Sequence, residues 1–315
     1  MRILLTALGT NNSSSICKYL RQNSENYLVG TDIYPKEYVV SSKEVNHFYQ
    51  VASIYEMHKY FNQLIEIIKK EKIEIVIPII DEEVLYFAQH LDVFDAIGVT
   101  VFVSNKESIQ ICRDKYQTFE LIKKHLPQIY TITKKNTEEI NKFPVFVKPN
   151  SGRASIGCQK ITDKFELDIL RHKGFENYIW QEYLEGDFFT VEFLYDPQTN
   201  YFNALVRQEL VRNKNGCGVV IQIQQNTFLE NIVLQIVRLI NFCGIGNCEF
   251  IYQNGKYHLI EINPRISAGI DYSIQAGMNF IQQKIDLCTY QKPIQNKTNI
   301  KYGTYFVRRY ETYEM

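Results

Sequence analysis

The stretch Tyr257-His258-Leu259-Ile260-Glu261-Ile262-Asn263-Pro264-Arg265 alternates apolar and polar residues toward its end. In a strand, alternate residues share a face, so Glu261, Asn263 and Arg265 point one way and the apolar residues between them point the other. One face then presents a carboxylate, an amide oxygen and a guanidinium. Mg²⁺ takes a few hard oxygen ligands together with substrate phosphates, and arginine grips phosphate with two hydrogen bonds. A strand with a plain solvated face shows the same alternation, so the segments upstream have to distinguish the two interpretations.

A second segment, from Phe143 to Gly157, is an apolar strand that ends in Lys148 and continues as a loop of small residues. Free backbone N–H groups in such a loop, beside a lysine, form a cradle for phosphates. Ser151, Gly152 and Gly157 are the candidates for these backbone contacts. On its own the loop is a weak signal, but it lies upstream of a strand that also suits phosphate.

A third segment contains the run Gln181-Glu182-Tyr183-Leu184 and then a strand that begins near Asp187. In this order and spacing, the three segments resemble the ATP-grasp superfamily, most closely the single-module proteins that are similar to one half of the carbamoyl-phosphate synthase large chain. The resemblance runs through essentially the whole chain. Its most specific element is Glu261-Ile262-Asn263-Pro264-Arg265, which matches the closing E-x-N-P-R motif of the family without a change.

The resemblance implies an α/β ATP-grasp fold in two domains. A Rossmann-like pre-ATP-grasp domain is expected at 1–107 and the ATP-grasp domain at 108–315. Within the second domain we expect a mobile lid lobe at about 116–185 and a C-terminal lobe built on an antiparallel sheet.

The first hundred residues independently favour a small parallel sheet, because strands and helices alternate there. The expected elements are strands at 2–8, 27–31 and 73–79 and helices at 13–22 and 55–71. The first turn, Gly9-Thr10-Asn11-Asn12-Ser13-Ser14-Ser15, has one glycine, where a dinucleotide fingerprint has three. An NAD-dependent oxidoreductase would rest on this lobe alone, and we do not assign NAD.

In ATP-grasp enzymes the N-terminal lobe contributes to the site of the acceptor, and this resemblance suggests a role for the turn after the third strand. Asp81 or Glu82 is placed there to lie near that site. Both carboxylates suit helix N-terminal capping and dipole compensation equally well.

By resemblance, the nucleotide site draws on three places. Lys115, within a helix predicted over 108–125, reaches the ATP phosphates together with Lys148. The adenine lies against the hinge strand Gln181-Glu182-Tyr183-Leu184. Asp187 accepts from a ribose hydroxyl, although the family usually has the longer Glu there, so Glu182 or Glu185 is the alternative.

The metal site needs a further carboxylate, and Glu249 is the candidate by family position. A strong hairpin signal, Gln253-Asn254-Gly255-Lys256, joins its strand to the motif strand. With a two-residue turn and regular pairing, Glu249 would face Ile260 and point away from Glu261. We therefore predict either an odd-numbered loop closed by a glycine bulge or a bulge between the two carboxylates.

With that geometry, Glu249, Glu261 and Asn263 are expected to bind one or two Mg²⁺ ions that bridge the β- and γ-phosphates, and Mn²⁺ is expected to be able to replace Mg²⁺. Arg265 and Lys148 stabilise charge on the transferring phosphoryl group.

The strand at 203–212 is expected to cross the site. Arg207 or Arg212 contacts phosphate or the acceptor carboxylate there by resemblance, with Arg207 the catalytic candidate, or else is a plain solvated residue. The loop at 266–273 leads into a helix, and it is expected to bind an anionic substrate group and to set substrate identity.

Two departures from the family affect these expectations. The phosphate loop has only two glycines and carries Arg153 inside it, so Arg153 either adds a phosphate contact or marks altered nucleotide handling. The chain also lacks the duplicated half of a carbamoyl-phosphate synthase, which makes synthesis of carbamoyl phosphate itself improbable.

Composition is that of a globular enzyme with small-molecule partners. Lys plus Arg and Asp plus Glu both number 35, so no net field draws the chain to nucleic acid or to an anionic membrane. The seven cysteines are scattered without a C-x-x-C pair, which suits reduced thiols in the cytoplasm. No apolar run is long enough for a signal peptide or a membrane span.

The sequence therefore predicts an ATP-dependent carboxylate–amine ligase that forms an acyl phosphate and releases ADP and phosphate. The alternative is a catalytically inactive ATP-binding regulator or partner protein of the same fold. The final segment, 299–310, is expected to supply an edge strand of the last lobe, and a homodimer contact there is the alternative role.

Overall fold

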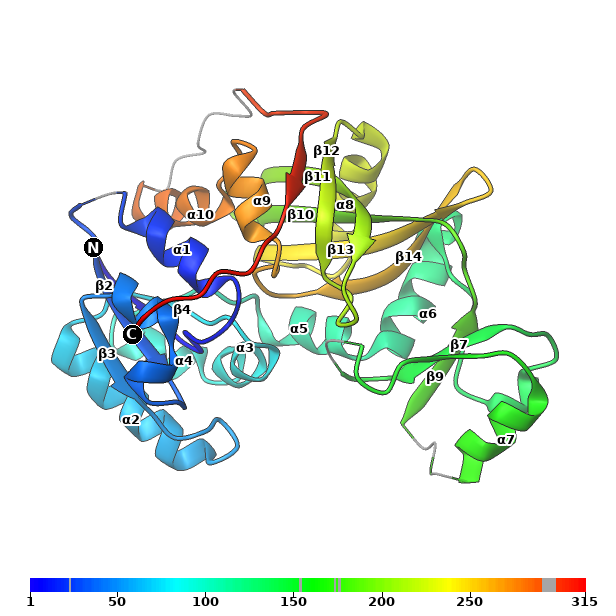
Figure 1. The fold of residues 1–315 in the computed structure, drawn as a ribbon, viewed down its shortest axis with the longest axis horizontal. Coiled ribbons are helices and arrows are strands. Elements are labelled where there is room, and N and C mark those ends of the chain that lie inside the picture. Colours follow the sequence, from blue (N-terminus) through cyan, green and yellow to red (C-terminus); the bar gives the residue numbers. More distant parts are fainter. Residues whose placement is uncertain (23, 153–154, 173, 175–176, 291–298) are drawn as a thin grey trace.

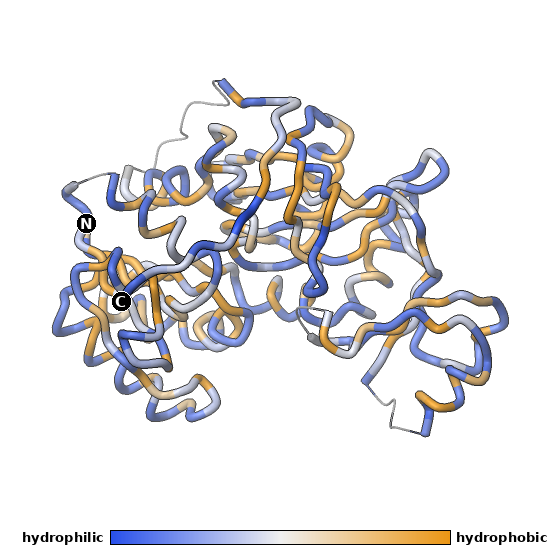
Figure 2. The backbone as a smooth tube through the Cα atoms, in the orientation of Figure 1, coloured by the Kyte–Doolittle hydropathy of each residue, from blue (hydrophilic) through white to orange (hydrophobic). Residues whose placement is uncertain are grey.

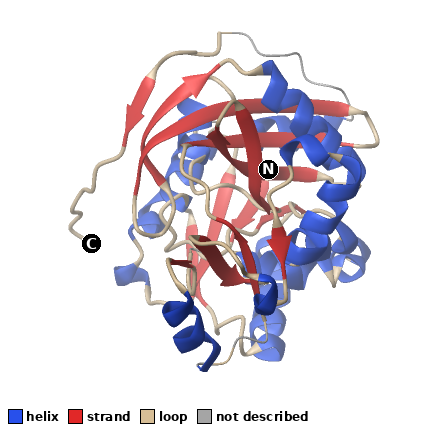
Figure 3. Cartoon of the chain, turned by 90° about the vertical axis from the view of Figure 1, so that its right-hand side faces the viewer, coloured by secondary structure: helices blue, strands red, loops and turns tan. Residues whose placement is uncertain are grey.

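Three sheets organise the chain (Figure 1), and the computed structural model describes residues 1–22, 24–152, 155–172, 174, 177–290 and 299–315. A parallel sheet forms the N-terminal lobe, a small sheet lies at the opposite end, and a large antiparallel sheet lies between them. Figure 3 shows helices packed along these sheets and the segment after the last strand running as an extended loop along one side. Among the described residues, no helix has both the length and the apolar character that a bilayer span requires.

The N-terminal sheet has the strand order β3-β2-β1-β4-β5, and every pairing in it is parallel. Its strands are β1 (Arg2–Leu5), β2 (Tyr27–Asp32), β3 (His47–Gln50), β4 (Ile75–Ile77) and β5 (Thr100–Val101). The α-helices of this lobe are α1 (Ser13–Leu20), α2 (Met57–Glu71), α3 (Asp81–Ala88) and α4 (Leu91–Ala96). The predicted parallel sheet is confirmed, but the sequence missed β3 and β5, because β3 is half exposed and polar and β5 has two residues.

A buried carboxyl group, Glu83, lies inside this lobe on α3. It accepts hydrogen bonds from the Thr6 hydroxyl at 2.5 Å and the Tyr60 hydroxyl at 2.6 Å. Burial raises the pKa of Glu83 from 4.5 to about 7, because the ionised form has lost its water, and the two hydroxyl bonds offset only part of that cost.

This pKa makes the stability of the lobe depend on pH. The folded pKa lies above the unfolded value, so the folded state keeps the proton longer, and stability falls as pH rises from about 4.5 to about 7. The cost at higher pH is on the order of 3 kcal/mol. We expect Glu83→Gln to remove this part of the pH dependence and to exceed the wild type in stability at pH 8.

Unfolding by denaturant at pH 5 and pH 8 measures the effect. Glu66→Gln, an exposed carboxylate on α2 of the same lobe, is the matched control and should track the wild type. If Glu83→Gln tracks it too, Glu83 does not titrate between these pH values.

The predicted single helix over 108–125 is wrong, because two helices, α5 (Lys106–Arg113) and α6 (Lys115–His125), meet at Asp114. Asp114 has an extended backbone and caps α6 by accepting from the backbone N–H of Gln117 at 2.9 Å. A short carboxylate that bonds the N–H three residues on favours a helix start over a helix interior. The break places Lys115 in the first turn of α6.

The small sheet has the order β6-β9-β7-β8. Its strands are β6 (Thr133–Lys134), β7 (Val145–Pro149), β8 (Gln159–Ile161) and β9 (Tyr178–Glu182), and one helix, α7 (Lys164–His172), accompanies them. Trp180 packs with Val147 and Leu167 in the core of this lobe. Helix α6, which the predicted lid range includes, instead packs Phe119 and Ile122 into the core of the large sheet.

The large sheet has the order β14-β13-β10-β11-β12-β15. Its strands are β10 (Asp187–Asp196), β11 (Tyr201–Arg212), β12 (Gly218–Gln224), β13 (Gly244–Gln253), β14 (Lys256–Asn263) and β15 (Tyr305–Val307). The accompanying α-helices are α8 (Thr227–Leu239), α9 (Ile270–Gln275) and α10 (Phe280–Tyr290). The predicted edge strand is confirmed as β15, while the dimer contact considered for the same segment stays a prediction.

Both faces of the large sheet are buried, and Figure 2 shows that hydrophobic residues run through the centre of this sheet. One face packs against α6 and α8. The other face packs Leu205 and Ile221 into a cluster with Ile3 and Leu5 of the N-terminal sheet. This shared core fixes the N-terminal lobe against the large sheet.

Candidate functional site

The β13–β14 hairpin carries the two carboxylates on one face. Its turn is the two-residue Asn254-Gly255, with φ of 51° and 78°, as a tight primed hairpin turn requires. Glu249 lies directly opposite Glu261, and the pairing then shifts by one residue between Glu249 and Phe250. Ile260 is the extra residue of this bulge. The predicted irregularity is confirmed, in its second form, and both carboxylates share a face.

Lys148 at the end of β7 is attached to this bulge. Its Nζ donates to the carbonyl oxygen of Ile260 at 2.9 Å, and the side chain is buried. Burial lowers the pKa of Lys148 to about 8, against the opposing effect of the Glu261 carboxylate. The lysine predicted for phosphate is thus held beside the carboxylates by a backbone oxygen that the bulge provides.

Lys115 joins three segments of the site. Its Nζ lies 3.0 Å from the Glu261 carboxylate and 3.3 Å from the carbonyl oxygen of Gly152. Its backbone N–H donates to the carbonyl of Asn150 at 3.1 Å. The start of α6, the small-residue loop and β14 are therefore tied together at one ammonium group.

A cavity of about 360 Å³ opens between the small sheet and the β13–β14 hairpin. The predicted nucleotide residues that line it are Lys115, Lys148, Gly152, Gln181, Glu182, Tyr183 and Leu184, together with Glu249 and Glu261. The strand ladder of β9 ends at Glu182, so Tyr183 and Leu184 lie beyond the last paired residue at the cavity wall. We call this the hinge cavity.

Some predicted nucleotide residues lie off the hinge cavity. Ser151 lines a small neighbouring recess, Gly157 lines a separate hollow on the small sheet, and Asp187 is exposed at the start of β10. Glu185 does line the hinge cavity, as the alternative to Asp187 required. Arg153 lies outside the described residues.

A second cavity, of about 390 Å³, adjoins the first and faces the N-terminal lobe. Its walls come from the first turn at 10–12, from Asp81, from the loop at 266–269 and from four arginines, which are Arg207, Arg212, Arg265 and Arg308. It shares Ser155, Arg212, Glu249 and Glu261 with the hinge cavity. We call it the acceptor cavity, and the two cavities meet at the paired carboxylates.

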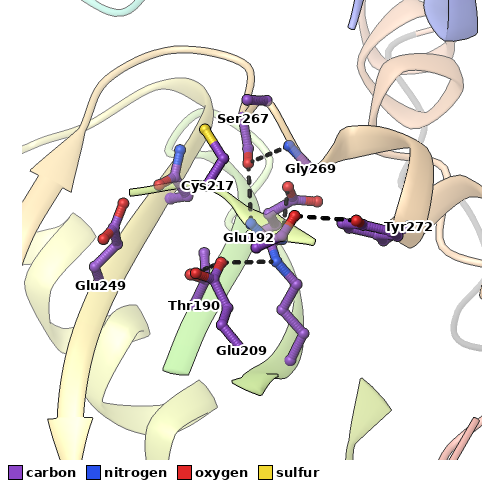
Figure 4. Close-up of polar contacts among 12 residues, drawn as sticks. Thr190, Glu192, Glu209, Cys217, Glu249, Ser267, Gly269 and Tyr272 are labelled. Atoms are coloured by element: carbon purple, nitrogen blue, oxygen red, sulfur yellow. Dashed lines mark hydrogen bonds and ion pairs between the residues drawn. The ribbon is translucent and has the colours of Figure 1, made fainter. Parts of the chain in front are cut away.

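Arg207 is fixed by a buried network in the wall of the acceptor cavity. Figure 4 shows three residues of this network, Glu192, Glu209 and Ser267. One terminal nitrogen lies 2.8 Å from Glu192, Nε lies 3.3 Å from Glu209, and the other terminal nitrogen donates to the Ser267 hydroxyl at 3.1 Å. All three guanidinium nitrogens are thus engaged within the protein. Its catalytic role stays a prediction, and its visible role is to hold the wall of the cavity.

Arg265 of the motif strand pairs with the N-terminal lobe. Its Nε lies 3.0 Å from the Asp81 carboxylate, and both residues line the acceptor cavity. Asp81 is the first residue of α3, and the N-cap position is Ile80. Asp81 therefore contributes to the cavity from the first turn of a helix rather than from its cap.

The sequence did not single out Arg308 and Glu209 as site residues. Arg308 follows β15 and contacts the Asp271 carboxylate and the carbonyl of Ala268, beside the motif loop. Glu209 pairs with both Arg207 and Arg212. In the sequence, Arg308 is a charged residue just after a strand and Glu209 is a charged residue within an apolar strand. Neither position shows which residue the side chain contacts in the folded protein.

The first turn of the N-terminal lobe is occupied by its own chain. Asp32, at the end of β2, accepts from the backbone N–H of Gly9 at 2.6 Å and of Tyr34 at 3.0 Å. A Cβ at Gly9 would lie 3.0 Å from that carboxylate. The carboxylate is thus already engaged at the place where a dinucleotide would need it free, so the NAD interpretation gains no support.

Comparison with protein families matches both parts of the chain. Residues 112–269 match the ATP-grasp domain, and residues 3–102 match the PylC-like, N-terminal domain. The chain belongs to the ATP-grasp family. The α/β class with a Rossmann-like N-terminal lobe and an antiparallel C-terminal sheet is the fold of this family, as the sequence predicted.

Two relatives of this chain share low sequence identity with it. Pyruvate carboxylase of Staphylococcus aureus is 23% identical over 303 residues, which cover 86% of this chain and 24% of that protein. D-alanine--D-alanine ligase A of Bacillus cereus is 31% identical over 111 residues, which cover 32% of this chain and 37% of that protein. The chain therefore spans about a quarter of the first relative and little more than a third of the second.

A solved structure extends the likeness over nearly the whole chain. The biotin carboxylase of Campylobacter jejuni, described as a β-γ-ATP complex, superposes with a TM-score of 0.76 at 13% identity, over 96% of this chain and 74% of that chain. At this identity the likeness establishes the fold.

The wall of the acceptor cavity has no room for a side chain at position 269. A Cβ there would lie 2.7 Å from the guanidinium of Arg207, which Glu192 and Glu209 hold in place. We expect Gly269→Ala to lower the free energy of unfolding by about 1–3 kcal/mol, as overpacking does. At Gly152, where the nearest neighbour of a Cβ would be 3.5 Å away, the same change should cost far less.

Chemical denaturation of the two variants beside the wild type measures this difference. Equal stability of the two variants would show that the Arg207 network yields without cost.

Proposed function

We propose that this chain is an ATP-dependent carboxylate–amine ligase, which transfers the γ-phosphoryl group of ATP to a substrate carboxylate and lets an amine displace phosphate. The observation that carries the proposal is the meeting of the two cavities at Glu249 and Glu261. Phosphoryl transfer needs a nucleotide on one side of such a carboxylate pair and an acceptor on the other. D-alanine--D-alanine ligase A, by its name, joins amino acids.

The hinge cavity fits the nucleotide. The backbone beyond the last paired residue of β9 offers N–H and C=O groups to the adenine edge, at Tyr183 and Leu184. Lys115 and Lys148 line the same cavity beside Glu261 and Ile260, where the phosphates would meet two ammonium groups. Lys148 is held by the carbonyl oxygen of Ile260, so this ammonium group is positioned before charge develops.

The donor set at the junction fits Mg²⁺. Glu249, Glu261 and Asn263 provide hard oxygens on one face of the hairpin, and Mg²⁺ favours one or two carboxylates plus substrate phosphates. Among the described residues, no three or more His, Cys, Asp or Glu side chains gather into a metal cluster. When bound, Mg²⁺ supplies neutralisation of phosphate charge at this junction.

The chemistry on the acceptor side needs positioning rather than a nucleophilic side chain. A carboxylate oxygen attacks the γ-phosphorus and ADP leaves. The amine nitrogen then attacks the acyl carbon, the C–O bond to phosphate breaks, and the amine loses a proton. Arg265, held by Asp81, presents its guanidinium to the acceptor cavity where negative charge develops.

Phosphate and ADP release, with Mg²⁺-ATP and a panel of carboxylates and amines, tests the proposal. We expect turnover that requires both a carboxylate and an amine. Glu261→Ala should reduce it by at least about 100-fold, because a charge-stabilising group is lost from the transition state. Glu120→Ala, an exposed carboxylate on α6, is the matched control and should keep wild-type turnover.

A second candidate function is the inactive ATP-binding regulator. Tight Mg²⁺-ATP binding without turnover on a broad panel would replace the ligase by this function. Absence of ATP binding would reject both.

A further inference from the structure

Each carboxylate at the junction is already paired with a cation of the same chain. A terminal nitrogen of Arg212 lies 2.7 Å from Glu249, and Lys115 lies 3.0 Å from Glu261. These are the two oxygen donors with full charge in the proposed metal site. A metal ion that takes them has to displace one or both of these cations.

Arg212 is built to remain at the junction after it leaves Glu249. Its Nε lies 2.7 Å from Glu209, the same nitrogen that meets Glu249 also donates to the carbonyl of Gly216, and the guanidinium lies 4.4 Å from the centre of the Phe188 ring. The side chain lines both cavities. When Glu249 leaves Arg212, one terminal nitrogen of the guanidinium becomes available to the phosphates, while Glu209 and Phe188 still hold the side chain.

The other arginine on this strand lacks that option. Arg207 uses all three of its nitrogens on Glu192, Glu209 and Ser267, and none of these three partners is a proposed metal ligand. Lys148 bonds a backbone oxygen and not a carboxylate. Among the described residues, the cations within ion-pair distance of Glu249 and Glu261 are Arg212 and Lys115.

Charge balance then sets the order of events. A metal ion that enters alone separates Arg212 from Glu249 and offers the guanidinium no anion in return. A nucleotide that enters alone meets Lys148, which bonds a backbone oxygen, while Arg212 and Lys115 are still paired with carboxylates. When both enter, the metal takes the carboxylates and the phosphates take the released cations, so every buried charge keeps a partner.

We propose that Arg212 is a positioning residue that changes partner, from the Glu249 carboxylate to the nucleotide phosphates, and that this exchange makes metal and nucleotide bind together. The proposal rests on the proposed function, because it takes the phosphates to lie at the junction. The coupling free energy is the same for both ligands. Nucleotide therefore increases the affinity for the metal by the same factor as the metal increases the affinity for the nucleotide.

Mn²⁺ binding, followed by the electron paramagnetic resonance signal of the free ion, tests the exchange without turnover. Wild type, Arg212→Gln and Arg238→Gln are compared in the absence of nucleotide. Arg212→Gln frees Glu249 and should bind Mn²⁺ at least about tenfold more tightly than the wild type, within the usual range of coupling effects. Arg238→Gln, on α8 and away from both cavities, should match the wild type.

The same titration with ATP present separates partner exchange from a general field effect. Loss of a nearby positive charge alone would tighten Mn²⁺ equally with and without ATP. Partner exchange tightens it only without ATP, so the ratio of the two affinities should shrink at least about tenfold in Arg212→Gln. Lys115→Gln is the second variant, and it should shift the ratio in the same direction through Glu261.

Thermal unfolding confirms that each variant is folded before it is titrated. An unchanged ratio in folded Arg212→Gln overturns the exchange at Arg212, whatever Lys115→Gln shows. A wild type that binds Mn²⁺ as tightly without ATP as with it does the same. Failure of every protein to bind ATP would instead contradict the proposed function, and that outcome is read from ATP binding by equilibrium dialysis with Mn²⁺ present.

Discussion

The bulge at Ile260 is the constraint on which the site depends. Without it, the two-residue turn of the β13–β14 hairpin would place Glu249 and Glu261 on opposite faces of the sheet, since a shift of one residue reverses the direction of a strand side chain. The same bulge exposes the Ile260 carbonyl that holds Lys148. One extra residue therefore places two carboxylates together and fixes an ammonium group beside them. The hairpin is regular at its turn and irregular beside the two carboxylates.

The acceptor cavity depends on a second constraint, the core shared by the N-terminal sheet and the large sheet. Ile3 and Leu5 pack in one cluster with Leu205 and Ile221, so the turn at 10–12 and Asp81 reach the cavity from a lobe that is fixed in place. The Asn12 amide donates to the carbonyl of Ser267 at 3.2 Å and joins the two lobes at the wall. Residues of both lobes therefore line this cavity, and under the proposed function both would contact the acceptor.

Much of the fold and part of the site could be predicted from the sequence, and the misses share a cause. Strand alternation identified Glu261, Asn263 and Arg265, and parity of the hairpin required the bulge. The break at Asp114 was missed because the helical pattern of apolar residues continues through this position. Only the extended backbone of Asp114 in the folded chain shows that its carboxylate caps a new helix. The pairing of Arg308 with Asp271 was missed because it forms between segments that only the folded chain brings together.

The ion pairs of the site could not be predicted by considering one residue at a time, because each charge has a partner from another segment. Four arginines line the acceptor cavity, and each is paired with at least one carboxylate. A buried charge is costly unless it is paired. Under the proposed function, a metal ion and phosphates would enter this site, so its charged side chains pair with one another before these ligands bind. Sequence shows which residues carry the charges. An ion pair can separate when a ligand enters if its cation keeps other partners in the protein. Arg212 meets this condition, because Glu209 and the Phe188 ring still hold it after it leaves Glu249.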